Sequence, residues 1–170
     1  MDDLVRGLKA GAPGAFDRLV REYGDRLYRF CLRLVGATEA EDVVQETFIR
    51  VHRSIGSYQP TGRFESWLFT IANHLALDAL RRSTGNRPEA EEPVDSAGPV
   101  DELSHREVQH ALLRAVERLP VEQKQVFLLR EEAGLSFREI AEMTRCPLNT
   151  ALGRMHYAME NLRKSLRAYQ

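Results

Sequence analysis

The sequence of 170 residues has few of the features that mark secreted, membrane or disulfide-bonded proteins. No apolar run approaches the ~20 residues needed to cross a bilayer, and the opening residues, MDDLVRGLKAG, lack the apolar core of a secretory signal. The two cysteines, Cys31 and Cys146, lie far apart and outside any C-x-x-C pair. This spacing predicts neither a disulfide framework nor a zinc site. We therefore expect a cytoplasmic protein without membrane insertion, in which both cysteines act as small apolar filler.

Signatures of enzymes are also scarce. The sequence has no glycine-rich phosphate loop and no convincing pair of nucleophile and base. A helical di-metal carboxylate site needs two Glu-x-x-His motifs and two further carboxylates. Glu102-Leu-Ser-His105 has this spacing, but it borders a segment that reads as a linker. We therefore predict no catalytic residue, no metal and no cofactor.

Charge is balanced overall but unevenly distributed. The net charge is −1, and the acidic excess lies between two neutral-to-basic segments. Residues 1–84 hold 12 basic and 11 acidic residues, residues 85–110 hold 2 and 7, and residues 111–170 hold 10 and 7. A free-standing DNA-binding protein is normally more basic overall. If the chain binds DNA, we expect a partner to supply much of the affinity.

Apolar residues recur at helical spacing almost throughout, and no segment alternates like a strand, so the sequence predicts an all-α protein. Residues 84–100 interrupt the pattern with three prolines, two glycines and four acids, which is typical of an extended linker. We therefore expect two small helical domains, residues 1–83 and 103–170, joined by an acidic linker over residues 84–102. Helices are expected over residues 2–10, 13–34, 38–55, 63–82, 103–119, 121–132, 136–143 and 147–166.

The buried face of each helix can be predicted from the same spacing. The expected core residues are Ala40, Val44, Phe48, Val51 and Ile55; Phe64, Leu68, Ile71, Leu75 and Ala79, with Trp67 and Phe69 off centre; Val108, Leu112, Leu113, Val116 and Leu119; and Leu148, Ala151, Met155, Ala158, Met159, Leu162 and Leu166. Capping boxes are expected at Thr38 with Glu41 and at Ser136 with Glu139. The arginines of the 13–34 helix are expected to form its solvated face.

A second face of the 38–55 helix is unusually acidic. It carries Asp42, Gln45, Glu46 and Ile49 before the first basic residue of the helix, Arg50. An acidic helix start suits the helix dipole, so the face is either an ordinary solvated surface or a docking face for another protein.

Two other stretches have the composition of nucleic-acid contacts. A short capped helix, a tight turn and a longer helix over residues 136–166 fit a helix-turn-helix, whose second helix enters the major groove by its first residues. An ordinary helical hairpin has the same pattern. Residues 57–82 mix aromatic and basic side chains, which can hold unstacked bases. Phe64 and Trp67 also fit a core, so we expect base contact only from the loop and the exposed helix face.

Taken together, these stretches resemble a known family. They include Ala40-Glu-Asp-Val-Val-Gln-Glu-Thr-Phe48, Phe64-x-x-Trp-Leu-Phe-x-Ile-Ala72, Leu77-Asp-Ala-Leu-Arg-Arg82, Leu119-Pro, Gly134-Leu-Ser-Phe-Arg-Glu-Ile-Ala141 and Pro147-Leu-Asn-Thr-Ala151. The sequence resembles a bacterial extracytoplasmic-function (ECF) sigma factor of the sigma-70 family over residues 10–167. The resemblance favours the docking-face interpretation and implies a transcription initiation factor that binds core RNA polymerase, at the β′ clamp helices and the β subunit, and promoter DNA.

The resemblance also assigns roles to individual residues. It implies polymerase binding by Asp42, Gln45, Glu46 and Ile49. It implies minus-ten DNA recognition and melting by Ser57, Tyr58, Arg63, Asn73, His74, Asp78, Arg81 and Arg82. It implies minus-35 recognition by Pro147, Asn149, Thr150, Leu152, Gly153 and Arg154. Family members often have Asn at the position of His74 and Lys at that of Leu152, which bears on the promoter sequence.

Two further expectations follow. The resemblance implies an anti-sigma factor as a partner, and a linker of about 17 residues reaches at most ~60 Å, nearly two turns of DNA at ~34–36 Å per turn. The alternative function is a free-standing helix-turn-helix repressor, which would bind DNA without polymerase. The neutral charge and the acidic linker argue against that alternative.

Overall fold

The computed structural model describes residues 3–83 and 100–167, with side chains in the second range described from residue 107. These residues form helices joined by loops, with no strand among them, which confirms the predicted all-α class. The helices are α1 (Asp3–Lys9), α2 (Ala15–Val35), α3 (Ala37–Ser54), the short 3-10 helix η1 (Ile55–Ser57), α4 (Phe64–Ser83), α5 (Val100–Glu117), α6 (Val121–Glu131), α7 (Phe137–Thr144) and α8 (Leu148–Ser165).

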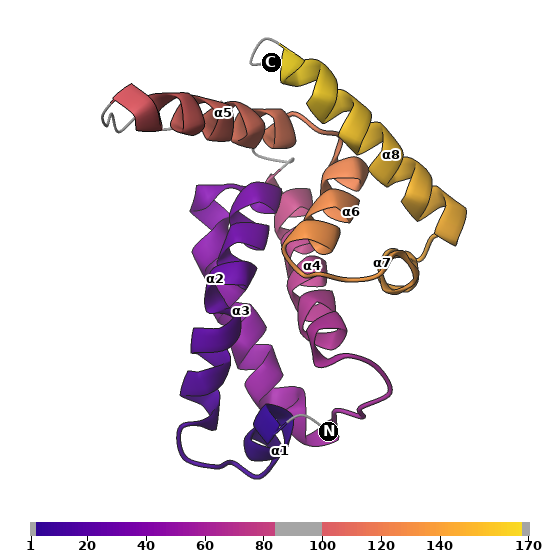
Figure 1. Cartoon of the computed structure of the whole chain (residues 1–170). Coiled ribbons are helices and arrows are strands. Elements are labelled where there is room, and N and C mark those ends of the chain that lie inside the picture. Colours follow the sequence, from indigo (N-terminus) through magenta and orange to yellow (C-terminus); the bar gives the residue numbers. More distant parts are fainter. Residues whose placement is uncertain (1–2, 84–99, 168–170) are drawn as a thin grey trace.

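Helices α2, α3 and α4 lie side by side as a bundle, with α1 at one end (Figure 1). We call α1–α4 the N-terminal bundle. The largest side chains in its centre are Phe30 of α2 and Phe69 of α4, both fully buried. Their rings meet edge to face, with centroids 5.5 Å apart and an interplanar angle of 88°, a geometry that adds roughly 0.5–1.5 kcal/mol to the burial of the rings. This core holds the outer surfaces of α3 and α4 in fixed positions.

The start of α3 differs from the prediction. The helix begins directly behind Gly36, and no side chain caps it, so the predicted capping box of Thr38 and Glu41 is wrong. Gly36 has a φ of 88° and ends α2 through its N–H bond to the Leu32 carbonyl, a conformation that glycine adopts without steric cost. The chain therefore enters α3 at once, and Thr38 already lies inside the helix.

Helices that pack on two sides bury more than one stripe of residues. In α3, Val43 and Thr47 are buried as well as Ala40, whereas the expected Val44 is only partly buried. In α4, Phe69 is fully buried, although helical spacing had placed it off the centre of the core face. Both helices contact two neighbours in the bundle, so a single stripe could not describe their buried surfaces.

The C-terminal helices, α5–α8, contain the predicted helix-turn-helix. Ser136 and Glu139 form the expected capping box at the start of α7. The turn to α8 runs through Arg145, which has a φ of 52° and whose N–H bonds to the carbonyls of Ala141 and Glu142. Cys146 also donates its N–H to the Ala141 carbonyl, at 3.0 Å. These bonds close α7 and set α8 across it.

Several expected core residues of these helices are exposed instead. Exposed fractions are 40% for Val108, 38% for Leu112, 41% for Leu148 and 42% for Met159. Helix α5 instead buries its small residues Ala111 and Ala115, together with Val116 and Leu119. Counting large apolar residues therefore misplaced the buried face of α5 by part of a turn.

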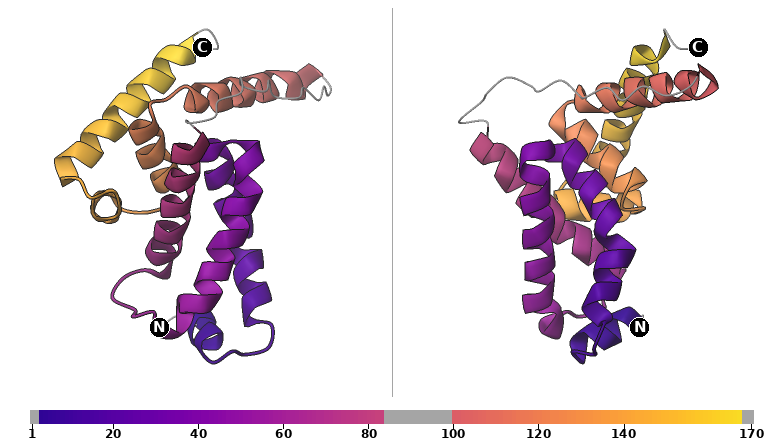
Figure 2. Two further views of the ribbon diagram at one scale, coloured as in Figure 1. Left: turned by 180° about the vertical axis from the view of Figure 1, so that it is seen from behind. Right: turned by 90° about the vertical axis from the view of Figure 1, so that its left-hand side faces the viewer.

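The two halves of the chain pack directly on each other. Helix α6 lies against α2 and beside α4, and α5 crosses the end of the N-terminal bundle (Figures 1 and 2). The expected linker, residues 84–102, falls mostly outside the described residues, and α5 begins at Val100. Direct packing between the halves was not predicted, and it decides which of the expected DNA-contacting residues are accessible.

Candidate polymerase and promoter interfaces

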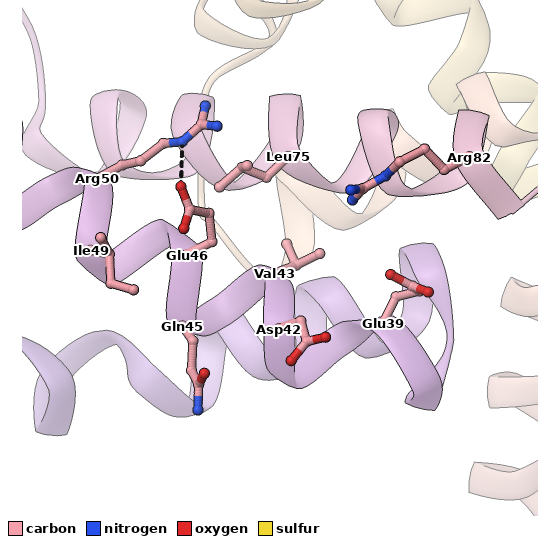
Figure 3. Close-up of a pocket in the computed structure, with 9 residues that line it drawn as sticks. All are labelled: Glu39, Asp42, Val43, Gln45, Glu46, Ile49, Arg50, Leu75 and Arg82. Carbon is pink, nitrogen blue, oxygen red and sulfur yellow. Dashed lines mark hydrogen bonds and ion pairs between the residues drawn. The ribbon is translucent and has the colours of Figure 1, made fainter.

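The acidic face of α3 is open to solvent. Asp42, Gln45 and Ile49 are exposed, and the Glu46 side chain is 40% exposed. Figure 3 shows these side chains with Glu39, Val43 and Arg50 of α3, and with Leu75 and Arg82 of α4, around one shallow groove. The Glu46 carboxylate accepts a hydrogen bond from Arg50 Nε at 3.0 Å. We call the four residues Asp42, Gln45, Glu46 and Ile49 the docking face.

The docking face combines negative charge with apolar area. Ile49 is 41% exposed, which is notable for a large apolar side chain next to two carboxylates. Val43 and Leu75, both largely buried, also line the groove. A groove with acidic edges and apolar walls is suited to bind a protein helix that carries lysine or arginine and aliphatic residues on one side.

The loop before α4 and the exposed side of α4 carry most of the expected minus-ten residues. Exposed positions are Ser57, Arg63, His74, Asp78, Arg81 and Arg82. Asp78 and Arg81 form an ion pair at 3.0 Å, and Ser57 Oγ donates to the Ser54 carbonyl at 2.9 Å. Arg82 points toward the groove of Figure 3 rather than away from it.

Tyr58 and Asn73, also expected to contact DNA, are buried. Tyr58 is 6% exposed, and its ring lies 4.6 Å from that of Trp67 and 5.8 Å from that of Phe64. Burial, with a smaller contribution from the Glu65 carboxylate, raises the pKa of Tyr58. The Tyr58 ring thus belongs to an aromatic cluster under the loop, where Lys9 Nζ lies 5.9 Å from its centroid. In this arrangement it is not free to stack on a base.

Asn73 is hidden by the other half of the chain. It is 1% exposed, and its Oδ1 accepts a hydrogen bond from Gln125 Nε2 of α6 at 2.9 Å. Arg63 is exposed but donates to the Gly134 carbonyl at 3.0 Å. Two of the expected minus-ten residues therefore use their polar groups within the chain.

The first turns of α8 present the expected minus-35 residues. Pro147, Asn149, Thr150 and Leu152 are exposed, and Gly153 and Arg154 are half-buried. Ala151 between them is fully buried. Leu152 is 42% exposed, so a large part of its side chain is not used in packing. An N-terminal helix turn with small polar residues on its outer side is suited to approach base edges.

Sequence reasoning missed a set of arginines on α2. It assigned them to solvent, but Arg26, Arg29 and Arg33 all bond to Glu132 just after α6. The three lie at i, i+3 and i+7, on one side of the helix. No local signal identifies a partner about 100 residues away, so only the structure reveals this contact.

Within the described residues, no group of three or more His, Cys, Asp or Glu side chains is arranged to hold a metal ion. None of the helices in residues 3–83 and 100–167 is both long and apolar enough to span a membrane.

Sequence families and relatives match both halves of the chain. Sigma-70 region 2 matches residues 19–85, and Sigma-70 region 4 matches residues 109–162. The ECF RNA polymerase sigma factor SigW of Bacillus subtilis is 30% identical over 177 residues, which cover 96% of this chain and 95% of SigW. The chain belongs to the ECF RNA polymerase sigma factors. This confirms the predicted family, and it does not favour a free-standing repressor.

Other ECF sigma factors give the same picture. The sigma-E factor of Escherichia coli K12 is 32% identical, over 92% of this chain and 89% of its own length. SigE of Mycolicibacterium smegmatis is 38% identical over 94% of this chain, which spans 64% of that longer protein.

Solved structures of two proteins share the fold. CnrH, in complex with the cytosolic domain of CnrY, matches with a TM-score of 0.71 and 23% identity, over 97% of this chain and 96% of its own. The sigma factor RpoE of Bartonella quintana, in complex with the anti-sigma factor NepR, matches with a TM-score of 0.73 and 21% identity, over 91% of this chain and 98% of its own. At these identities the likeness shows the fold.

Proposed function

We propose that this ECF sigma factor binds core RNA polymerase, directs it to specific promoters and helps to melt the minus-ten region. The main support is the match of region 2 and region 4 models to the two halves, in that order. The protein acts in the cytoplasm by binding alone, without a catalytic step. The two matched regions supply two DNA-reading surfaces, and the docking face supplies the contact to polymerase.

The docking face binds the clamp helices of the polymerase β′ subunit. Its support is the exposure of Asp42, Gln45 and Ile49 beside an apolar groove. The carboxylates select basic side chains on the partner, and Ile49 supplies apolar area at the centre of the contact. The β subunit forms a further contact.

Minus-ten DNA is read by the 57–63 loop and α4. Arg81 and Arg82, exposed at the end of α4, contact phosphates, and His74 and Asp78 on the same outer side reach the bases. Melting uses binding energy, because capture of an unstacked base offsets the few kcal/mol that unstacking costs. Ser57 and Arg63 extend this surface. Asn73 joins it only when α6 no longer covers it, and the buried Tyr58 supports the loop through its ring contacts with Phe64 and Trp67.

The minus-35 element is read by the start of α8. Asn149 and Thr150 lie on its exposed first turn, and Leu152 is suited to contact a thymine methyl group. Gly153 allows close approach of the backbone, and Arg154 contacts a phosphate. Pro147 fixes the direction in which α8 leaves the turn.

An anti-sigma factor holds the protein inactive until it is needed. Support comes from CnrH and RpoE, which share the fold and were each solved in complex with a second protein, the cytosolic domain of CnrY and the anti-sigma factor NepR.

Charge reversal on the docking face tests the polymerase contact. We expect Asp42→Lys or Glu46→Lys to weaken binding to core polymerase at least about tenfold, because a charged hydrogen bond contributes roughly 1.5–3 kcal/mol and the new lysine repels a basic partner. Asp25→Lys is the matched control, because Asp25 is exposed and lies on α2, whereas the docking face lies on α3. Binding is measured by titration with labelled protein. Undiminished binding by both docking-face variants would show that the face does not contact polymerase.

A further inference from the structure

Four arginines of the N-terminal bundle converge on the segment that joins α6 to α7. Arg26 Nε donates to the Glu132 carbonyl at 2.9 Å, and Arg26 Nη2 donates to the Ala133 carbonyl at 3.0 Å. Arg63 Nη1 donates to the Gly134 carbonyl at 3.0 Å. Arg29 and Arg33 bond to the Glu132 side chain. We call Arg26, Arg29, Arg33 and Arg63 the arginine clasp.

The clasp binds the negative end of a helix. Glu132, Ala133 and Gly134 follow directly after the last residue of α6, Glu131. Carbonyls at a helix C-terminus lack partners within the helix and carry partial negative charge. Arg26 satisfies the carbonyl of Glu132, the C-cap of α6, and Arg26 and Arg63 bond to the next two carbonyls, those of Ala133 and Gly134. The chain directly after α6 is therefore bonded to the N-terminal bundle.

Glu132 adds a full charge to this contact. Its side chain is 9% exposed, and one carboxylate oxygen accepts from Arg29 Nε at 2.9 Å while the other accepts from Arg33 Nη1. A nearly buried carboxylate needs such partners, because losing them leaves an unpaired charge away from water. The neighbouring Glu131 is exposed, so water solvates its carboxylate and it needs no charged partner.

A buried amide pair forms a second contact between the halves. Gln125 of α6 is 5% exposed and Asn73 of α4 is 1% exposed, and Gln125 Nε2 donates to Asn73 Oδ1 at 2.9 Å. Among the described residues, no buried side-chain nitrogen or oxygen lacks a partner. Two hidden carboxamides that satisfy each other fix one specific packing of α6 on α4, because other packings would leave them unpaired.

These contacts occupy groups that the proposed function assigns to DNA. Asn73 and Arg63 are both minus-ten residues of that proposal, and both are bonded across the halves. The Glu132 carboxylate bonds to Arg29 and Arg33 of α2, to which the proposed function assigns no DNA contact, so it holds the halves together and the masking concerns Asn73 and Arg63. The docking face on α3 remains exposed in the same arrangement.

We propose that the structure is a self-inhibited state, in which the arginine clasp and the Asn73–Gln125 pair hold region 4 on the minus-ten surface of region 2. The halves must separate before Asn73 and Arg63 can contact a promoter, whereas polymerase can dock at α3 beforehand. Sixteen residues, 84–99, lie between α4 and α5, which allows a span of up to ~60 Å. The masking of DNA-contacting residues rests on the proposed function, but the closure itself does not.

Small-angle X-ray scattering of the full chain tests the closure. The free protein is expected to have a radius of gyration of about 16 Å, the value for a compact chain of this length. Glu132→Lys places a third positive charge against Arg29 and Arg33 and is expected to favour opening at least about tenfold, since each charged hydrogen bond lost is worth roughly that factor. Opening should raise the radius of gyration to about 20–25 Å, given the reach of the intervening residues.

Two variants make the scattering result specific. Glu131→Lys changes the charge by the same amount at an exposed neighbour and should remain compact. The triple variant Glu132→Arg, Arg29→Glu, Arg33→Glu restores opposite charges and should close again, with unchanged helix content by circular dichroism. A wild-type chain that is already expanded, or a Glu132→Lys variant as compact as wild type, would overturn the proposal.

In vitro transcription with core polymerase tests the inhibition. Glu132→Lys should form open complexes several-fold faster than wild type and Glu131→Lys, which carry the normal clasp. An expanded Glu132→Lys variant with the wild-type rate would refute self-inhibition and leave the initiation function intact. If no variant supports polymerase-dependent transcription, the proposed function fails, while the scattering still decides whether the chain closes on itself.

Discussion

Phe69, which helical spacing placed off the centre of the core face, is fully buried, and truncating it measures what its packing contributes to stability. Its ring is fully buried against Phe30 at 5.5 Å, and the guanidinium of Arg26 lies 5.8 Å from the ring centroid. Phe69→Ala removes the apolar burial, the edge-to-face pair and the cation–π contact. Deletions of this kind cost about 3–5 kcal/mol. At roughly 2–4 °C per kcal/mol for a chain of this size, the melting temperature should fall by about 6–20 °C.

Leu112→Ala is the matched control. Helical spacing placed Leu112 in the core, but the structure leaves it 38% exposed. Its truncation should lower stability by no more than about 0.5 kcal/mol, as for other surface substitutions. Both variants are compared with wild type by thermal unfolding followed by circular dichroism at one protein concentration. A loss of less than ~2 °C for Phe69→Ala, or a larger loss for Leu112→Ala, would refute the packing of α4 against α2.

Two other substitutions test local features. Ser136 caps α7, because its Oγ accepts a hydrogen bond from the Glu139 N–H and donates one to the Glu139 carboxylate. Ser136→Ala removes this cap and should lower the free energy of unfolding by about 1 kcal/mol. Glu139→Gln, which keeps a capping box, should cost less, so equal losses in thermal unfolding would contradict the capping role. Burial raises the pKa of the Cys31 thiol from 9.0 to about 12, so at pH 8 a thiol reagent should label only Cys146 in the native chain and both cysteines in denaturant. Because this pKa is higher in the folded than in the unfolded chain, the stability that the neutral Cys31 thiol contributes is complete below pH 9 and is progressively lost as the pH rises toward 12. Rapid labelling of both thiols in the native chain, or a free energy of unfolding that does not change over that pH range, would contradict the burial of Cys31.

Local sequence signals predicted the elements well where the relevant chemistry is local. Gly36 ends α2, and the Ser136–Glu139 capping box starts α7, because each feature depends on residues within one turn of the helix. The docking face also lies exposed on one side of α3, since four residues at helical spacing must share a side.

Other features depend on how helices pack, which spacing alone does not give. A single buried stripe describes a helix with one neighbour. Because α4 packs against both α2 and α3, the prediction from one stripe did not place Phe69 at the centre of the core. It also failed for α5, where alanines form the contact and Leu112 does not. The alanine side chain is too small to stand out among larger apolar residues.

The contacts between the halves had no sequence signal at all. Glu132 bonds to Arg29 and Arg33, which lie about 100 residues earlier in the chain, and Asn73 finds Gln125 across a segment read as a linker. Charged and amide residues are normally assigned to the surface. Their burial follows from the tertiary packing of α6, so the masked state of Asn73 could not be predicted.

The initiation role is tested most directly by in vitro transcription with core RNA polymerase, this protein and a library of promoter fragments. We expect specific start sites that appear only when the protein is added, and alignment of their upstream DNA should show two separated elements. If no transcript appears although the protein binds DNA by itself, the initiation role is contradicted. The repressor function would then be favoured, and the assignment of Asp42, Gln45, Glu46 and Ile49 to polymerase docking would have to be abandoned.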